Sequence, residues 1–167
     1  MTQSTEQDII WLTPAAHESL KAELENLKGP VREEIVTRIS EARDEGDLKE
    51  NGGYHAAREE QGKNEGAILQ LEDLLRRAIS DLPPSDGIVE PGMVVTYKFE
   101  GDDDDEAEQF LLGARENEGY VDIAVYSPQA PLGEALLGAR KGDTVAFDAP
   151  TGKTLQVMVL DVSAYGD

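Results

Sequence analysis

The sequence predicts an α+β fold in which a long antiparallel helical hairpin precedes a small β-sheet domain. Apolar residues recur every three or four positions through two successive runs of the first half, which is the helical period. The second half contains short runs rich in Val, Phe and Tyr between Gly, Pro and Asp, which is typical of strands and turns. The pattern changes at Leu82-Pro83-Pro84, so we expect a helical domain over residues 1–83 and a sheet domain over residues 84–167.

The first helix is expected to begin at Pro14. Thr13 can cap backbone N–H groups, and Pro14 suits the first helical position because its φ angle is fixed. An apolar stripe follows at helical spacing and comprises Ala16, Leu20, Leu24, Leu27, Val31, Ile35, Ile39 and Ala42. Gly29-Pro30 interrupts the stripe, because proline removes a backbone donor and crowds the preceding turn. The spacing stays in phase on both sides, which predicts a kink or short break followed by more helix.

A second helix is expected after residue 53. Its stripe has the same period and comprises Tyr54, Ala57, Gln61, Asn64, Ile68, Leu71, Leu75 and Ile79. A short linker makes two helices antiparallel neighbours, and Gln61 and Asn64 place amides on the seam, where such groups set register more than they strengthen packing. We therefore expect a coiled-coil hairpin spanning roughly 40 Å. The same periodicity fits two uses of such a hairpin. It can extend a functional group to a distant site, or it can serve only for dimerisation.

The turn between the helices, near residues 44–53, is crowded with carboxylates. It contains Asp44, Glu45, Asp47 and Glu50, together with three glycines, Gly46, Gly52 and Gly53, that allow the chain to reverse. Mg²⁺ is usually held by one or two carboxylates with phosphates and water, and Asp47 and Glu50 can supply such a pair. Two carboxylates on an exposed turn do not complete a ligand shell, so a partner would have to supply the rest. A solvated acidic turn is the alternative.

The composition excludes several classes of function. Cysteine is absent, which removes disulfides, thiolate catalysis and cysteine-based zinc sites. The formal net charge of -20 argues against free-standing affinity for nucleic acid, so another molecule would have to hold any RNA. No apolar run reaches the roughly 18 residues of a membrane span, and the start of the chain lacks the parts of a signal peptide. We expect a cytoplasmic protein with no membrane partner.

The region from Glu41 to Gly62 resembles the signature of the GreA/GreB family of bacterial transcription elongation factors, GreA most closely. The matching residues are Glu41-Ala42-Arg43, Gly46-Asp47-Leu48-Lys49-Glu50-Asn51 and Tyr54-His55-Ala56-Ala57-Arg58-Glu59-Glu60-Gln61-Gly62, with Leu12-Thr13-Pro14, Ser127-Pro128 and Lys141-Gly142-Asp143 elsewhere. The resemblance implies an accessory factor, not itself an enzyme, that enters the secondary channel of bacterial RNA polymerase. There it would stimulate the polymerase's own Mg²⁺-dependent cleavage of backtracked RNA and so rescue arrested complexes.

The resemblance assigns the chemistry to two carboxylates. Asp47 and Glu50 match the family's acidic pair, which shares Mg²⁺ with the polymerase active site and positions the hydrolytic water. The free protein is not expected to hold this ion tightly. This sequence departs from many members at Gly52-Gly53, which replaces an Ala-Glu pair, removes a carboxylate and adds backbone freedom.

Four further residues match positions associated with RNA or polymerase. Arg43 and Arg58 match basic positions that contact the 3′ end of the backtracked RNA or the channel, with pairing to neighbouring glutamates as the alternative. Asn51 and Tyr54 match tip positions that contact RNA or polymerase, and packing at the helix start is the alternative for Tyr54. His55 invites interpretation as a general base, but a water held between two metal ions needs no imidazole base.

The second half is expected to form a small sheet with one short helix. The strand candidates are Val94 to Phe99, Phe110 to Leu112, Val121 to Tyr126, Thr144 to Phe147 and Leu155 to Val162, and the helix candidate is Leu132 to Arg140. The charge run Asp102 to Asp105 is interpreted as a solvated loop, because it lacks the spacing of an EF-hand. The resemblance makes this domain FKBP-like and implies that it grips the rim of the polymerase channel.

Two other functions remain open. A Gre-homologous protein can also occupy the channel as a non-catalytic inhibitor of RNA polymerase, although Asp47 and Glu50 favour activation. An FKBP-like fold joined to a coiled coil is also compatible with a prolyl isomerase or a holdase chaperone. Against this, we expect too few aromatic residues in the second half to line a proline pocket, and fold alone does not establish activity.

Overall fold

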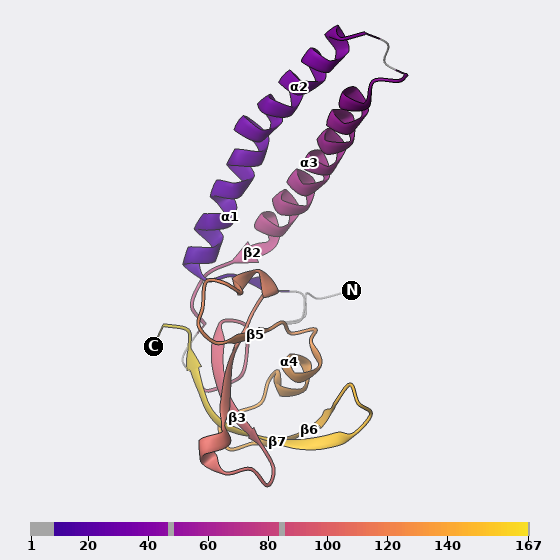
Figure 1. Ribbon diagram of the computed structural model, residues 1–167. Coiled ribbons are helices and arrows are strands. Elements are labelled where there is room, and N and C mark those ends of the chain that lie inside the picture. The colour runs from indigo at the N-terminus through magenta and orange to yellow at the C-terminus, as the bar shows by residue number, and fades with distance from the viewer. Residues whose placement is uncertain (1–8, 47–48, 84–85, 167) are drawn as a thin grey trace, which may run out of the picture. The chain divides into compact units, whose positions relative to one another are not determined.

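The computed structural model describes residues 9–46, 49–83 and 86–166, which form two compact units (Figure 1). One unit is Glu18–Arg77, and the other combines the described residues up to His17 with those from Ala78 onward. The N-terminal segment, expected in the same domain as the hairpin, therefore packs with the second half of the chain. None of the helices in the described ranges combines the length and apolar character that crossing a lipid bilayer requires.

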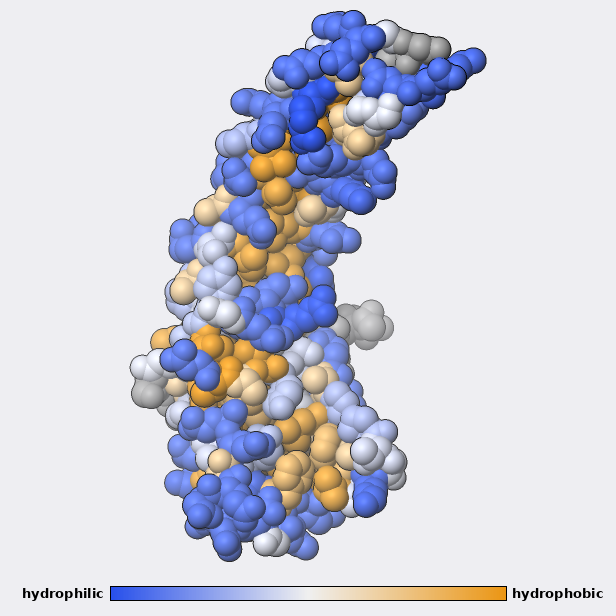
Figure 2. All heavy atoms as spheres, in the orientation of Figure 1, coloured by the Kyte–Doolittle hydropathy of each residue, from blue (hydrophilic) through white to orange (hydrophobic). Residues whose placement is uncertain are grey.

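The hairpin expected from the periodicity is present. The first arm consists of α1 (Pro14–Asn26), the π-helical turn η2 (Leu27–Val31) and α2 (Arg32–Asp44), and the second arm is α3 (Gly52–Arg77). The buried side chains of Ile35, Ile39 and Ala57 join α2 to α3. Apolar side chains run along the hairpin between polar flanks (Figure 2). The two helices thus bury the stripe that the sequence predicts.

The irregularity predicted at Gly29-Pro30 is a π-helical turn. Pro30 lies inside η2, where a wider turn makes room for a ring that would crowd an α-helix. The carbonyl oxygen of Leu27 in this turn accepts a hydrogen bond from Nδ2 of Asn64 on α3 at 3.1 Å. Asn64 is only 8% exposed. The buried amide on the seam therefore fixes α3 to the turn where the first arm departs from α-helical geometry.

Three ion pairs link the described parts of the two arms of the hairpin, and each has its cation on the same arm. The cations lie on the first arm and the carboxylates on α3, in the pairs Lys28–Glu72 at 3.4 Å, Arg32–Glu65 at 2.8 Å and Arg38–Glu60 at 2.7 Å. The two arginine pairs are bidentate. Exposed ion pairs add little free energy each, but a displaced α3 would lose all three together. They therefore favour one register of the hairpin.

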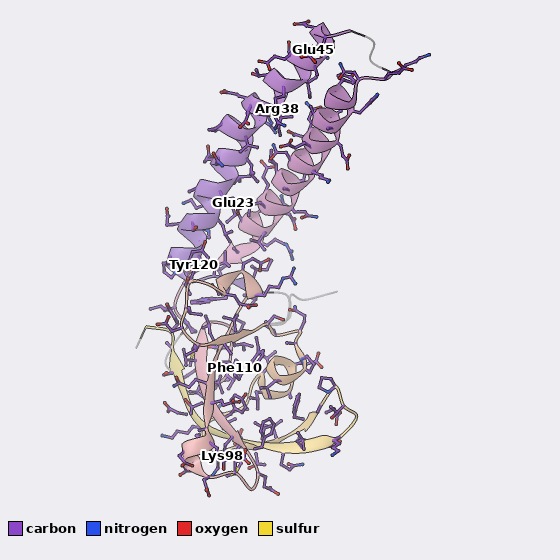
Figure 3. The ribbon with its side chains drawn as sticks, in the orientation of Figure 1. Glu23, Arg38, Glu45, Lys98, Phe110 and Tyr120 are labelled. Atoms are coloured by element: carbon purple, nitrogen blue, oxygen red, sulfur yellow. The ribbon has the colours of Figure 1, made fainter. Side chains whose placement is uncertain are left out.

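The second unit contains a five-stranded sheet in the order β5-β4-β3-β7-β6. Its strands are β3 (Met93–Phe99), β4 (Glu108–Leu112), β5 (Ala124–Tyr126), β6 (Thr144–Asp148) and β7 (Thr154–Ala164). Neighbouring strands are antiparallel except β4 and β5. The helix α4 (Pro131–Leu136) contributes Leu132 and Leu136 to a core shared with Val95 and Phe110, the last labelled in Figure 3. The small α+β domain expected from the sequence is confirmed.

The N-terminal segment is fixed to this second unit by a buried asparagine. β1 (Ile10–Trp11) pairs in parallel with β2 (Ala78–Ile79), and Trp11 is fully buried. Asn117, at the end of the 3₁₀ turn η4 (Arg115–Asn117), accepts a hydrogen bond from Thr13 N–H at 2.8 Å and donates to the carbonyls of Trp11 at 2.9 Å and Ala114 at 2.8 Å. One side chain thus satisfies three backbone groups.

The predicted start of the first helix is confirmed at this point. Pro14 is the first residue of α1, and the hydroxyl oxygen of Thr13 accepts a hydrogen bond from Ala16 N–H at 3.0 Å. This is the N-cap expected from the sequence. Because Asn117 holds the N–H of the same threonine, the cap and the buried amide position the beginning of α1 together.

Replacing Asn117 with alanine should destabilise the second unit strongly. Asn117 is 0% exposed, so Asn117→Ala leaves the Thr13 N–H without its acceptor and removes one of the two hydrogen bonds that the carbonyls of Trp11 and Ala114 each accept, at a cost of about 3 kcal/mol in the free energy of unfolding. Urea denaturation followed by Trp11 fluorescence measures the change. Asn26→Ala is the matched control, because Asn26 is exposed and its side chain makes no capping hydrogen bond. Equal stability of the two variants would contradict the assigned role.

Acid should weaken the hairpin through its ion pairs. Hydrogen bonds from Arg38 and Arg32 hold the pKa values of Glu60 and Glu65 below the ordinary value of 4.5. Because the folded pKa is the lower one, each carboxylate stabilises the folded state above pH 4.5 and loses this contribution as pH falls through the folded pKa.

The double variant Glu60→Gln/Glu65→Gln should therefore lose less stability than the parent protein as the pH falls below 4.5. Urea denaturation of the helical circular dichroism signal at each pH measures the loss. Glu33→Gln, at an exposed position on α2, controls for the removal of charge and should follow the parent protein. Identical pH dependence of the double variant and the parent would exclude the ion pairs as the cause.

Candidate functional site

The candidate site is the end of the hairpin between α2 and α3. Asp47, half of the predicted acidic pair, lies outside the described residues, whereas Glu50 is described and exposed. Gly46 has a φ angle of 133°, which residues other than glycine rarely adopt. Gly52 and Gly53 instead form the first turn of α3 and have no positive φ angle. Of the three glycines expected to reverse the chain, only Gly46 has a backbone conformation that requires glycine.

Exposed carboxylates gather at this end of the hairpin. Asp44 ends α2, Glu45 follows it, and Glu50 precedes α3, all with exposed side chains. Glu45 is labelled at the end of α2 in Figure 3. In the described part of the chain none of the three forms an ion pair. Their oxygens are therefore accessible to a ligand, and no shell of protein groups surrounds them.

Asn51 connects the two helices at this end. Its Oδ1 accepts a hydrogen bond from Tyr54 N–H at 3.0 Å, which makes Asn51 the N-cap of α3. Its Nδ2 donates to the carbonyl oxygen of Ala42 in the last turn of α2. The family resemblance assigned Asn51 only a role in contacting RNA or polymerase. The preference of asparagine for the N-cap position could have predicted the cap. No pattern in the sequence predicts the hydrogen bond from Asn51 to the carbonyl oxygen of Ala42.

Arg43 and Arg58 line one groove on the hairpin. Arg43 comes from α2 and Arg58 from α3, and the groove has a volume of about 260 Å³. Its other lining residues are Val36, Ile39, Ser40 and Gln61. Neither guanidinium has an ion-pair partner within residues 18–46 and 49–77, so the pairing with neighbouring glutamates is not observed there. Two positive charges thus lie in a groove next to the acidic end, in reach of an anionic ligand.

Tyr54 and His55 support the beginning of α3. Tyr54 is partly buried and packs against the cluster of Ile35, Ile39 and Ala57. Its ring meets the ring of His55 edge to face, with the centroids 5.5 Å apart. Nε2 of His55 lies 3.3 Å from the carbonyl oxygen of Lys49, so the ring supports the turn when that nitrogen carries the proton. The observed contacts of both side chains lie within the hairpin.

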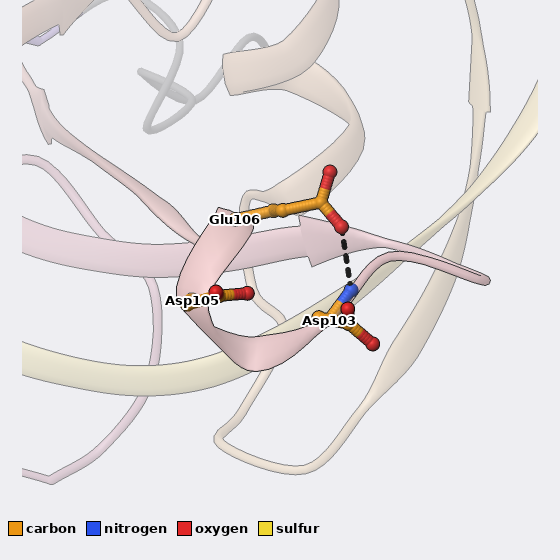
Figure 4. Close-up of side chains that lie close together, drawn as sticks. All are labelled: Asp103, Asp105 and Glu106. Atoms are coloured by element: carbon orange, nitrogen blue, oxygen red, sulfur yellow. Dashed lines mark hydrogen bonds between the residues drawn. The ribbon is translucent and has the colours of Figure 1, made fainter.

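A second group of carboxylates lies in the other unit and is explained by its own turn. Oxygens of Asp103, Asp105 and Glu106 lie within 4.8 Å of one another, and all three residues are exposed. They belong to the turn around η3 (Asp104–Glu106), where Glu106 Oε1 accepts a hydrogen bond from Asp103 N–H at 2.9 Å (Figure 4). Lys98 pairs with Asp104 at 2.7 Å. The solvated acidic loop expected here is a short capped turn.

The sheet unit also contains an aromatic pocket of about 400 Å³. Four rings line it, those of Tyr97, Phe99, Tyr126 and Phe147, together with Pro131 and Leu132 of α4. The expectation that few aromatic residues would line a pocket is therefore wrong, because β3, β5 and β6 bring together rings that are far apart in sequence. The hydroxyl of Tyr97 donates to Glu108 at 3.0 Å, and burial, reinforced by this bond, raises the pKa of Tyr97.

Comparison with known proteins gives matches over nearly the whole chain. A family model described as "Transcription elongation factor, N-terminal" matches residues 10–79, and one described as "Transcription elongation factor, GreA/GreB, C-term" matches residues 84–164. The chain is 51% identical to the transcription elongation factor GreA of Streptomyces coelicolor, over 99% of each chain. It is 48% identical to that of Saccharopolyspora erythraea, over 96% of this chain and 98% of the relative.

Solved structures also match along the chain. The structure titled as GreA factor homolog 1 (Gfh1) of Thermus thermophilus has 27% sequence identity and a TM-score of 0.40. The match covers 93% of this chain and 99% of that chain.

The glycines at the tip should differ in their tolerance of alanine. A Cβ at Gly52 meets nothing within 4 Å, and one at Gly53 meets its nearest atom at 3.5 Å. Gly52→Ala/Gly53→Ala should therefore raise the free energy of unfolding of the hairpin by about 1 kcal/mol, because the unfolded chain loses freedom. Gly46→Ala should lower it by about 1 kcal/mol or more, since its φ angle is strained for alanine.

Urea denaturation monitored by helical circular dichroism measures both changes. A double alanine variant less stable than the parent protein would show that Gly52 and Gly53 are needed for a backbone conformation other than the helical one described.

Proposed function

Because the chain belongs to the GreA/GreB family of transcription elongation factors, we propose that it inserts its acidic hairpin end through the secondary channel of bacterial RNA polymerase and stimulates cleavage of backtracked RNA. The observation that carries this proposal is the exposed carboxylate of Glu50 at the end of a paired hairpin. The chain acts as an accessory factor in the cytoplasm, and the endonuclease activity belongs to the polymerase. Arrested complexes are thereby returned to elongation.

Glu50 and Asp47 act as ligands that complete a shared metal site. An exposed turn offers one or two carboxylates but no enclosing shell, so the donor set suits an ion held mainly by another protein. Mg²⁺ held by these two carboxylates and the partner would supply Lewis-acid activation of a water for phosphodiester hydrolysis. The chain contributes carboxylate oxygens at the correct position and leaves the rest of the reaction to its partner.

Arg43 and Arg58 hold the phosphates of the backtracked RNA near this end. Both guanidinium groups line the same groove and have no ion-pair partner in the described part of the hairpin. Guanidinium groups bind phosphate with paired hydrogen bonds, which orients the RNA as well as attracting it. The net charge of -20 opposes binding of free RNA, so these residues act only on RNA that the polymerase already holds.

The sheet unit supplies affinity for the polymerase. Its aromatic pocket presents the side chains of Tyr97, Phe99, Tyr126 and Phe147, which offer apolar area to a partner side chain. Burial of such area is the main source of affinity in protein interfaces, whereas an acidic arm adds little. We assign attachment at the channel rim to this unit and the chemistry to the hairpin end.

The names of the relatives favour stimulation over inhibition. The two curated relatives described above are named transcription elongation factors, which agrees with an activator and not with a non-catalytic inhibitor of the polymerase. The family membership likewise replaces the prolyl isomerase or chaperone interpretation, which depended on fold analogy.

Neutralising the acidic pair should abolish stimulation without weakening binding. Glu50→Gln and Asp47→Asn each remove a ligand charge, so the maximal cleavage rate of a backtracked complex should fall about a hundredfold. The factor concentration giving half-maximal cleavage should stay within about twofold, because binding is assigned to the other unit. The measurement is RNA shortening in purified stalled complexes over a range of factor concentrations.

Glu45→Gln is the matched control, since Glu45 is another exposed carboxylate at the same end of the hairpin. It should cleave like the parent protein. If Glu45→Gln and Glu50→Gln lose activity equally, general acidity and not a defined ligand pair is responsible. If Asp47→Asn and Glu50→Gln both retain full activity, the proposed mechanism is wrong.

A further inference from the structure

Among the described residues, the side-chain amide of Asn51 is the hydrogen-bonded connection between α2 and α3 that lies nearest the end of the hairpin. Its Oδ1 accepts from Tyr54 N–H in the first turn of α3, and its Nδ2 donates to the carbonyl oxygen of Ala42 in the last turn of α2. Asn51 is half-buried. One planar group therefore contacts the backbones of both helices at the point where the chain leaves one and enters the other.

Other contacts between the arms are weaker here in the described part of the chain. The side-chain ion pair nearest this end, Arg38–Glu60, lies about one helical turn further from it. Gly52 and Gly53 have no side chains to pack, and the apolar cluster reaches only to Tyr54. The separation of the helix ends therefore depends mainly on Asn51.

We propose that Asn51 is a positioning residue, which fixes the separation of the ends of α2 and α3 and so holds the neighbouring carboxylate of Glu50 in place for the polymerase active site. This inference rests on the proposed function. Glu50 is exposed and precedes Asn51 directly, so a change in the backbone at residue 51 is transmitted to it. A displacement of about 1 Å in a reacting group can reduce a rate a hundredfold.

The geometry supplies a way to replace the amide by a covalent link. A Cβ atom built on Gly53 lies 4.0 Å from the Cβ of Ala42, the residue whose carbonyl Asn51 binds. Cβ atoms joined through a disulfide are about 3.5–4.5 Å apart. The chain contains no cysteine, so Ala42→Cys/Gly53→Cys introduces a single thiol pair, which an added oxidant closes and dithiothreitol reopens.

The closing experiment compares cleavage by the parent protein, Asn51→Ala, and Asn51→Ala carrying this thiol pair. Asn51→Ala should lower the maximal cleavage rate at saturating factor about tenfold, with the half-saturating concentration unchanged. Simple loss of folded protein would have the opposite signature, a raised half-saturating concentration with the same maximal rate. The oxidised thiol pair should restore the maximal rate to within about threefold of the parent, and the reduced pair should not.

Two further variants keep the test decisive. Asn51→Asp retains an acceptor for Tyr54 N–H but turns a second oxygen toward the Ala42 carbonyl, so it should be as slow as Asn51→Ala. Asn26→Ala, at an exposed position without a capping bond, should match the parent protein. A fast Asn51→Asp, or an oxidised thiol pair that fails to restore Asn51→Ala, would overturn the positioning role and favour direct contact of Asn51 with RNA.

Amide exchange separates this inference from the proposed function. Asn51→Ala should accelerate hydrogen exchange of the Tyr54 amide about tenfold, because this N–H loses its acceptor, and the oxidised thiol pair should not reverse this, because a disulfide offers no acceptor. If the parent protein itself fails to stimulate cleavage, the proposed function fails. Unchanged Tyr54 exchange in Asn51→Ala would overturn the inference whatever the cleavage result.

Discussion

The pairing of α2 with α3 is the constraint on which the site depends. An isolated turn rich in carboxylates has no fixed position, whereas one held between two paired helices has. The buried contacts near the tip are few, chiefly Ile35, Ile39 and Ala57. The ion pairs and the bond from Asn64 to Leu27 add register to this small core. Register matters more than strength here, because a shift of α3 would move Glu50.

Repulsion between carboxylates destabilises the end of the hairpin. Asp44, Glu45 and Glu50 are exposed without ion pairs in the described residues, and pairing them with lysine or arginine would occupy the oxygens that a metal needs. Uncharged features therefore stabilise the turn. The amide of Asn51 binds the carbonyl oxygen of Ala42, and Gly46 adopts the positive φ angle at the end of α2. The groove with Arg43 and Arg58 keeps positive charge beside the carboxylates without neutralising them.

Local patterns in the sequence were sufficient to predict the elements but not the contacts between distant residues. The helical period predicted both arms, and Thr13 and Pro14 marked the start of α1. Asn117 could not be found this way, because its partners Trp11 and Thr13 are about a hundred positions away. The aromatic pocket was missed for the same reason. At the tip, glycine composition indicated a reversal, but the φ angles that distinguish Gly46 from Gly52 and Gly53 depend on where α3 begins.

In the proposed function, the two units divide affinity from chemistry for a physical reason. A carboxylate that must accept a metal from another protein gains nothing from being bound tightly beforehand, and its charge weakens association with any anionic surface. The acidic end is therefore a poor source of affinity. An aromatic pocket has the reverse properties, because its binding free energy comes from apolar area and does not depend on the metal. Under this proposal, placing the pocket in the other compact unit allows binding strength to change without moving Glu50, and allows the tip to change without releasing the partner.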